Sequence, residues 1–465
     1  MKADLYEDIS RLMFENRLGE HLSRAVPRYE KLYDLYKGKH EINHRTVGKN
    51  KPNNRLSADF YGKLIDTEIG YFLGRPIVFN SENNEALDNL GTILVNNEFD
   101  ELIMEVGKEA SIKGKSYMMI YQDEDSETKL CRLSPESVFT FESKRGRGEI
   151  GVAVRIYEEV DEYENTHIYL EVYDKEHIHY LDFTSGVLGV DKRYEVNPVS
   201  HIFPGVPIIE VKNNEEEMGS FEKVISLVEA YDLLLSDTSN EHEAYRNAYL
   251  LLKNLTADSD TMDKLRDSGI IEVYDDGDAK FLSKPILDSA IESHLNRLAT
   301  DIHRFADIPD LSDENFAGNL SGVAIRFKLL GLENKCIIKE RKMTKAIRRM
   351  VKLINGVLAV KDGGEVIDVT KLQLIFNRNI PNNLTEIVDT VVKLDGMVDK
   401  DTLLSLLPFV ESPQEVIEKL EREKDNYAND VERYANANFI QDTEDEATEQ
   451  RFGQFSKDDE ELEAI

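Results

Sequence analysis

Cysteine, long apolar runs and positive charge are all scarce in this chain. Its two cysteines, Cys131 and Cys336, lie far apart in the sequence, which indicates reduced thiols and no disulfide framework. No run approaches the ~18 apolar residues of a membrane-spanning helix, and the opening MKADLYEDISRLM lacks the apolar core of a signal peptide. We therefore expect no disulfide, no membrane segment and no targeting signal.

The shortage of positive charge excludes one broad class of function. The 465 residues carry 57 basic and 90 acidic side chains, a formal net charge of −33. Because affinity for phosphates comes mainly from Lys and Arg, this balance argues against a general nucleic-acid binder. The length predicts roughly three domains.

One segment, residues 322–361, departs from this acidic background. It contains no proline and is followed by Gly363 and Gly364, and residues 323–361 carry eleven Lys or Arg against Glu333 and Glu340, a local net charge of +9. The pattern predicts a helix roughly 58 Å long at ~1.5 Å per residue. A helix of this length belongs to a coiled coil, a membrane span or a special assembly, and its charge excludes the membrane.

The pattern of apolar and polar residues divides the remaining chain into segments. Residues 1–115 read as amphipathic helices, and residues 116–205 as short antiparallel strands. The helix predicted from residue 219 turns polar after Leu235, which suggests one end in a core and the other at a wet interface. The further expected segments are an α/β insert at 247–284 with strands 270–274 and 279–282 joined by a turn at 275–278, a helix at 285–306, a polar linker at 307–322, a strand at 372–376, helices near 385–396, 400–407 and 413–437, and a disordered acidic tail at 441–465.

Two sequence motifs resemble enzyme signatures. His40, Glu41 and His44 match the H-E-x-x-H pattern of zinc peptidases, which requires both histidines on one helical face and a third ligand. Gly38 precedes the motif, GKNKPNN follows it, and no third ligand is evident. We interpret the motif as a surface loop and predict no metal site.

The second motif, G-x-G-x-x-G at residues 146–151, is followed by the strand-like VAVRIYE, so we interpret it as a hairpin turn rather than a nucleotide site. His177 and His179 lie in a predicted strand with no Cys or carboxylate ligand pattern around them, so we expect a structural or surface role. No catalytic constellation stands out, and we predict no catalytic residue, no cofactor and no enzyme activity.

Several stretches, in order, carry a resemblance to a known family. The chain resembles the portal proteins of tailed bacteriophages, in the family typical of siphophages of Gram-positive hosts and their prophages. The matching stretches are YEKLYDLYKGKHEI, PNNRLSADFYGKLIDTEIGYFLGRPI, NEFDELIMEVGKEASIKGKSYMMIY, VPIIEVKNNEEEMGSFEKVISLVEAYDLLLSD and PDLSDENFAGNLSGVAIRFKLLGLENK with the helix after it, which together span roughly residues 29–360.

The resemblance implies the fold class, which is α+β and mainly helical. It implies a portal-type subunit with a wing of helices plus a small antiparallel β domain, a helical stem, a small α/β clip, a long kinked spine helix and a helical crown. The implied boundaries are 1–218 for the wing (helical 1–115, β-rich 116–205, crossing 206–218), 219–246 and 285–306 for the stem helices, 247–284 for the clip, 307–322 for the tunnel loop, 323–361 for the long helix, 362–440 for the crown and 441–465 for the tail.

Three groups of site residues follow from the resemblance. The tunnel loop would narrow a DNA channel through Asp313, Glu314, Asn315, Phe316, Gly318, Asn319, Ser321 and Gly322. The clip would dock the packaging motor and connector through Lys264, Arg266, Asp267, Asp275, Asp276 and Asp278. The long helix would use Lys335, Lys339, Lys342, Lys345, Arg348 and Arg349 either toward the channel or, as we favour, in ion pairs with acids of a neighbouring subunit.

The implied function is that of a ring, usually of twelve subunits, at the unique capsid vertex of the virion, assembled in the host cytoplasm. The expected partners are other copies of the chain, double-stranded DNA in transit bound non-specifically, the terminase large subunit, a head-tail connector or adaptor protein, and the major capsid and scaffolding proteins. Two alternatives remain: a non-enzymatic helical adaptor of head assembly, and a zinc metallopeptidase built on His40, Glu41 and His44.

Overall fold

The computed structural model divides the chain into two units, Met1–Asn379 and Ile380–Ile465, each of which is taken here by itself. The described residues are 4–6, 9–48, 51–143, 148–245, 249–253, 263, 277–282, 288–311, 322–361, 365–379, 388, 391–407, 410, 413–414, 416–417 and 419–423.

Helices dominate the N-terminal region, as the sequence predicts, after a short strand pair of β1 (Asp4–Tyr6) and β2 (Ile9–Ser10). Their boundaries follow local chemistry: the side chains of Ser10, Asp59 and Asn83 cap the N-termini of α1, α3 and α4. The helical elements are α1 (Arg11–Glu20), the π-helix η1 (His21–Ala25), α2 (Val26–Tyr36), the 3-10 helix η2 (Glu41–His44), α3 (Phe60–Leu73), α4 (Asn84–Asn96) and α5 (Phe99–Lys113).

Gly114 ends α5 and allows the chain to turn into the first long strand. Its φ of +94° lies in the left-handed region that favours glycine, and a Cβ there would collide with the carbonyl of Glu217. The strand that follows, β4 (Lys115–Gln122), lies between β5 (Thr128–Leu133) and β12 (Ile208–Lys212) in an antiparallel three-stranded sheet.

A larger antiparallel sheet confirms the predicted change to a two-residue period. Its strands follow the order β10-β9-β8-β7-β6, with β11 also paired to β9. Residues 148–151 of the G-x-G-x-x-G motif lead into β7, which pairs antiparallel with β6, so the motif opens a strand of a hairpin and not a helix. The strands are β6 (Val138–Glu142), β7 (Ile150–Val160), β8 (Thr166–Tyr173), β9 (His177–Asp182), β10 (Gly189–Val190) and β11 (Val199–Ser200).

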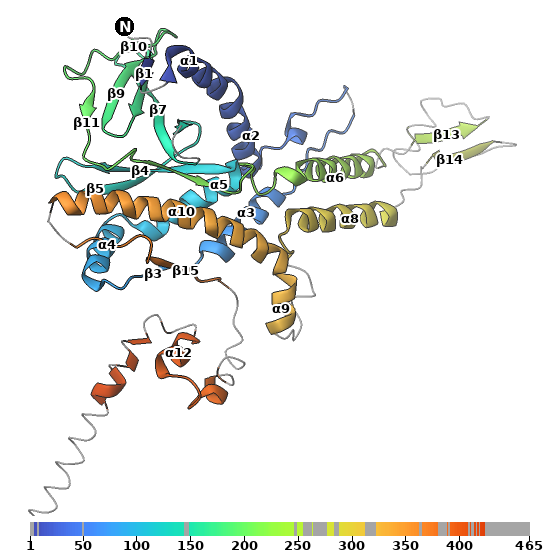
Figure 1. Ribbon diagram of the computed structural model, residues 1–465. Helices are drawn as coiled ribbons and strands as arrows, with labels where there is room; N and C mark the ends of the chain where they lie inside the picture. The colour runs from blue at the N-terminus through green and yellow to red at the C-terminus, as the bar shows by residue number, and fades with distance from the viewer. Residues whose placement is uncertain are drawn as a thin grey trace, which may run out of the picture. The chain divides into compact units, whose positions relative to one another are not determined.

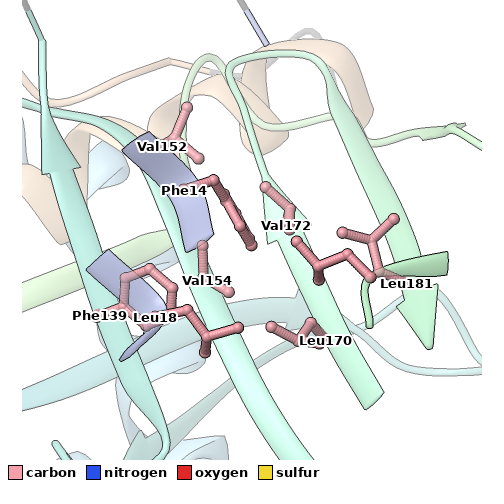
Figure 2. Close-up of a cluster of buried hydrophobic side chains, with 9 residues drawn as sticks. Phe14, Leu18, Phe139, Val152, Val154, Leu170, Val172 and Leu181 are labelled. Atoms are coloured by element: carbon pink, nitrogen blue, oxygen red, sulfur yellow. The ribbon is translucent and has the colours of Figure 1, made fainter. Parts of the chain in front are cut away.

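Helix α1 covers one face of this larger sheet. Phe14 and Leu18, one helical turn apart, are buried among apolar side chains from four strands (Figure 2). The ring of Phe14 lies 5.9 Å from that of Phe139, edge to face. The partners of the two α1 residues are Phe139, Val152, Val154, Leu170, Val172, Leu181 and Leu188.

Two helices, α6 (Ile225–Tyr245) and α8 (Asp288–Ala306), lie side by side (Figure 1). The 3-10 helix η3 (Glu222–Val224) leads into α6. Between the two helices in sequence, β13 (Tyr249–Lys253) pairs with β14 (Asp278–Leu282). The expected strand at 279–282 is therefore present, but its described partner is β13, whereas the expected partner at 270–274 lies outside the described residues.

The predicted long helix is interrupted once. It forms α9 (Gly322–Lys328) and α10 (Leu330–Lys361), with Leu329 between them. Backbone hydrogen bonds from Leu329 to Ile325 and from Glu333 to Leu329 continue across the break, so the path bends without a loop. The prediction of a single uninterrupted helix was therefore wrong in detail, because the structure contains a kinked helix.

The strand expected at 372–376 is present as β15 (Gln373–Phe376), and its partner is β3 (Ile77–Asn80), some 290 residues earlier. The pairing is antiparallel and places Phe376 over Phe72, with the rings stacked 5.5 Å apart. In the C-terminal unit, α12 (Lys400–Ser405) falls within the helix expected near 400–407, and the side chain of Asp399 caps its N-terminus.

Candidate functional site: the long helix and the α6–α8 pair

Most of the expected tunnel-loop and clip residues lie outside the part of the chain that the structure describes. For the tunnel loop this applies to Asp313, Glu314, Asn315, Phe316, Gly318, Asn319 and Ser321, while Gly322 is the first residue of α9. For the clip it applies to Lys264, Arg266, Asp267, Asp275 and Asp276. Asp278, which was expected in a turn, instead begins β14 opposite Lys253.

The basic residues at the start of α10 have partners within their own chain. Lys335 donates to the backbone carbonyls of Ser220, at 3.2 Å, and Ala306, at 3.1 Å. The first carbonyl belongs to the segment before α6 and the second to the last turn of α8. A single ammonium group therefore ties the long helix to the segment that enters α6 and to the last turn of α8.

Lys339 is buried more deeply, with only 5% of its surface exposed. Its Nζ lies 2.7 Å from Oε1 of Glu68, which is itself fully buried, and donates to the hydroxyl of Ser111 at 2.6 Å. From the sequence, the expected counterpart of Lys339 was the channel or an acid of a neighbouring subunit. That expectation does not fit Lys339, because a buried ammonium group is already paired inside the subunit with a carboxylate that the sequence gave no reason to pick out.

Two lysines share the single carboxylate of Glu68, since Lys335 also approaches its Oε1 at 3.5 Å. Burial alone would raise the pKa of Glu68, but the attraction of Lys335 and Lys339 outweighs burial and lowers it. Burial lowers the pKa of Lys339, and Glu68 offsets this only in part. The carboxylate thus stays ionised, while the pKa of Lys339 lies below the ordinary lysine value.

The other four of the six expected site residues on the helix also contact their own chain. Lys342 pairs with the exposed Glu215, and Lys345 donates to the carbonyl of Gly148 at 3.1 Å. Arg348 donates to the carbonyl of Leu372 and Arg349 to that of Val206, at 3.1 and 3.5 Å. Pairing within the subunit is an alternative that the sequence analysis did not consider, and for these four the proposed channel or intersubunit role stays a prediction.

A cavity of about 520 Å³ opens beside this buried network. Its walls come from the segment before α6, the end of α8 and the first turns of α10. The side chain of Asn213, 3% exposed, has an oxygen without a hydrogen-bond partner there. The main lining residues are Asn213, Met218, Phe305, Asp307, Lys335 and Ile338.

His40 is not on the surface, so the loop interpretation of the H-E-x-x-H motif was wrong for this residue. It is 2% exposed, and its Nδ1 lies 2.5 Å from Oδ2 of Asp232 on α6. Glu41 and His44 belong to the short η2 and are exposed. Among the described residues, no group of three or more His, Cys, Asp or Glu is arranged to hold a metal ion.

The polar half of α6 accepts hydrogen bonds from backbone amides between Asn54 and Ala58, which belong to residues 42–58, a segment that we name the basic strap. Asp232 accepts from the amide of Ala58 at 2.8 Å, and Ser236 accepts from the amide of Leu56 at 2.9 Å. One turn further, Asn240 accepts from the amide of Asn54 at 2.6 Å. These α6 residues recur every four positions and therefore lie in one row.

Sequence reasoning noticed that α6 turns polar but assigned that face to a wet interface. The structure shows that part of it is occupied by the basic strap, because backbone amides without a sheet partner need acceptors. The four-residue spacing of Asp232, Ser236 and Asn240 is the signal that could have indicated a row of acceptors.

Both cysteines are free thiols, as expected. Burial raises the pKa of the Cys336 thiol to about 12, so it is not a reactive thiolate. Within the described part of the chain, no helix combines the length and apolar character needed to cross a membrane.

Comparison with known proteins identifies the class to which these features belong. Residues 15–430 match the family described as "Phage portal protein, SPP1 Gp6-like". A portal protein of Bacillus phage SPP1 is 27% identical over 395 residues, covering 82% of this chain and 78% of that protein. A portal protein of Clostridium phage phiCD119 is 25% identical over 388 residues, covering 79% and 84%.

The family match extends over most of the chain and includes the helical N-terminal region, both sheets, the α6–α8 pair and the long helix. The chain therefore belongs to the SPP1 Gp6-like family of phage portal proteins.

Proposed function

We propose that this chain forms a ring at one vertex of a phage capsid and that the ring is the channel for DNA entry and exit. The family membership over residues 15–430 is the observation that carries the proposal. The protein would act through interfaces and a central opening and not through catalysis, as a component of the virion that assembles in the host cytoplasm.

The proposed parts of the subunit follow the expected boundaries. Residues 1–218 would be the wing, α6 and α8 the stem, and 247–284 a clip that docks the terminase large subunit and later a head-tail connector. Residues 307–322 would be the tunnel loop, 323–361 the long helix, 362–440 the crown, and 441–465 an acidic tail. Major capsid and scaffolding proteins would surround the wing.

The acidic composition supports a channel through which DNA slides. A formal charge of −33 on each subunit gives a ring a strongly negative potential, which repels phosphates and opposes lasting contacts. Within each subunit, the ties from Lys335 to Ser220 and Ala306 would transmit movements of the stem to the long helix.

Native mass spectrometry of the full-length protein, with negative-stain images of the same sample, tests this function. A ring of twelve chains of 53.3 kDa would have a mass of roughly 640 kDa and a central hole. A species near the mass of one or two chains at every concentration, even with capsid and scaffolding proteins present, would overturn the ring and favour a helical adaptor.

The role of the exposed basic residues of α10 is tested separately. Neutralising Lys342 and Lys345 together should weaken ring assembly at low salt if these residues also face acids of a neighbouring subunit. Unchanged assembly with altered DNA packaging or retention would assign them to the channel.

A further inference from the structure

The basic strap is unusual in this acidic chain because all of its charged side chains are positive. Residues 42–58 contain Arg45, Lys49, Lys51 and Arg55 and no acidic residue. In a chain with 33 more acids than bases, such a segment is an exception that calls for a physical account.

The strap is held in place by its backbone, which leaves its cations available. The α6 row of Asp232, Ser236 and Asn240 accepts from the amides of the strap over two helical turns. Fixing a backbone in one conformation costs conformational entropy. The three hydrogen bonds to one face of α6 offset this cost and hold the segment in one position. Arg55 lies between two of the anchored residues, Asn54 and Leu56, so these hydrogen bonds also fix its backbone.

Only one described strap cation has an acidic partner in its own chain. Arg45 pairs with Asp237 of α6 at 2.6 Å. Arg55 is exposed and donates to the carbonyl of Asn43, and Lys51 is exposed as well. Among the described residues, no carboxylate pairs with Lys51 or Arg55.

The other flank of the helix pair carries the complementary charge. Asp288 and Glu292, four residues apart on α8, lie on one face of that helix and are exposed. On α6, His242 marks the side toward α8, since its Nε2 lies 3.7 Å from Oδ1 of Asp288. At about 100° per residue, His242 lies roughly a third of a turn from the middle of the strap-binding row.

We infer that the basic strap of one subunit docks on the acidic start of α8 of the next subunit, through Lys51 and Arg55 against Asp288 and Glu292. The inference rests on the proposed ring. A head-to-tail interface joins two different surfaces of the same chain and closes into a ring when repeated. The basic strap and the acidic start of α8 are two different surfaces of one chain with opposite charge, so they can form such an interface.

A second copy fits this surface better than DNA does. Lys51 and Arg55 stand beside a helix that itself carries Asp237, Glu241 and Glu243, and the chain as a whole repels phosphates. In a ring, the carboxylates of the neighbouring copy are held close to the strap, so their effective concentration there is high.

Paired charge reversals in the full-length protein test this inference. One variant is Lys51→Glu with Arg55→Glu, and the other is Asp288→Lys with Glu292→Lys. Alone, each places like charges at every interface, and we expect the apparent association constant to fall about tenfold near physiological salt. The defect should shrink at high salt, because screening weakens repulsion.

Mixing the two variants gives the decisive result. Every interface between unlike variants again joins opposite charges, so the mixture should form rings in which the two variants alternate, which native mass spectrometry detects from a mass tag on one of them. Reversal of Arg24 and Lys192, exposed cations outside the helix pair, changes the net charge equally and should leave assembly unchanged.

Each other outcome is also informative. If the wild type forms rings and the variant rings have the same salt stability, the result would overturn the strap interface but not the proposed ring. Loss of assembly that mixing does not restore, or normal rings with impaired DNA retention, would also overturn it. Absence of wild-type rings under all conditions would count against both the interface and the proposed function.

Discussion

Two N-terminal segments each cover an element that occurs much later in the chain, and they do so by opposite means. Helix α1 covers the larger sheet with Phe14 and Leu18, which are buried in an apolar cluster. The basic strap covers α6 through hydrogen bonds to Ser236 and its neighbours. Apolar burial contributes stability in proportion to area and depends little on salt. Hydrogen bonds to backbone contribute less, but they fix a charged segment without neutralising it.

The comparison teaches what each kind of contact provides. The α1 contact secures a fold, whereas the strap contact sets the position of charges. We therefore expect substitutions under α1 to reduce global stability and substitution of Ser236 in the α6 row to loosen the strap alone.

The largest effect is expected from Phe14→Ala. Removing a buried ring leaves a cavity, and we expect a loss of about 3–5 kcal/mol in the free energy of unfolding. Urea denaturation followed by circular dichroism measures it. Met13→Ala, at an exposed neighbouring position, is the matched control, and a loss as large as that of Phe14→Ala would show that α1 as a whole, not its buried face, matters.

The next effect concerns the buried charges under α10. Glu68→Gln leaves the ammonium groups of Lys335 and Lys339 without their carboxylate, and we expect a loss of about 3 kcal/mol. The double variant Glu68→Gln with Lys339→Met should lose less than Glu68→Gln alone, because it removes one of the uncompensated charges. Equal losses in thermal denaturation would mean that the pair is not coupled.

A smaller and local effect is expected from Ser236→Ala. It removes the acceptor of the Leu56 amide, and the cost of about 1 kcal/mol corresponds to roughly fivefold faster hydrogen exchange of the strap. Ser239→Ala is the control, since the hydroxyl of Ser239 donates to Leu235 within α6. Faster exchange throughout α6, and not only in the strap, would contradict a local role.

The last effect is confined to acid pH. Burial raises the pKa of Glu217, but Lys115 and Lys212 outweigh it and lower the pKa to about 2 from the ordinary value of 4.5. A lowered folded-state pKa stabilises the fold above about 4.5, and this contribution is lost as the pH falls toward 2. Glu217→Gln should therefore flatten the decline in stability between these values. An unchanged slope in acid titrations monitored by fluorescence would contradict this assignment.

Local sequence patterns predicted the helices and strands well where side-chain period or glycine placement determines them. The helices of residues 1–115, the antiparallel strands and the hairpin at 146–151 follow from side-chain period and glycine placement. The strand at 372–376 was also predicted, but its pairing with β3 was not, because its partner lies almost 300 residues away.

The candidate site was less predictable. The positive charge of α10 was evident from the sequence, yet the partners of Lys335 and Lys339 were not, since Glu68 lies in a helix whose other buried residues are mostly apolar. His40 was interpreted as a surface residue because its flanking sequence is polar, although Asp232 on α6 holds it in the interior.

The sequence by itself determined the secondary structure, the absence of a disulfide pattern, the excess of acid and the family resemblance. These properties depend on neighbouring residues or on composition, and both can be read along the chain. Only the tertiary structure decided that Lys335, Lys339 and their basic neighbours on α10 contact their own subunit and that the strap occupies part of the polar face of α6. Most of these contacts join residues more than 100 positions apart, as Lys339 and Ser111 or Leu56 and Ser236 do, so the neighbours of a residue in sequence do not identify its partner in space.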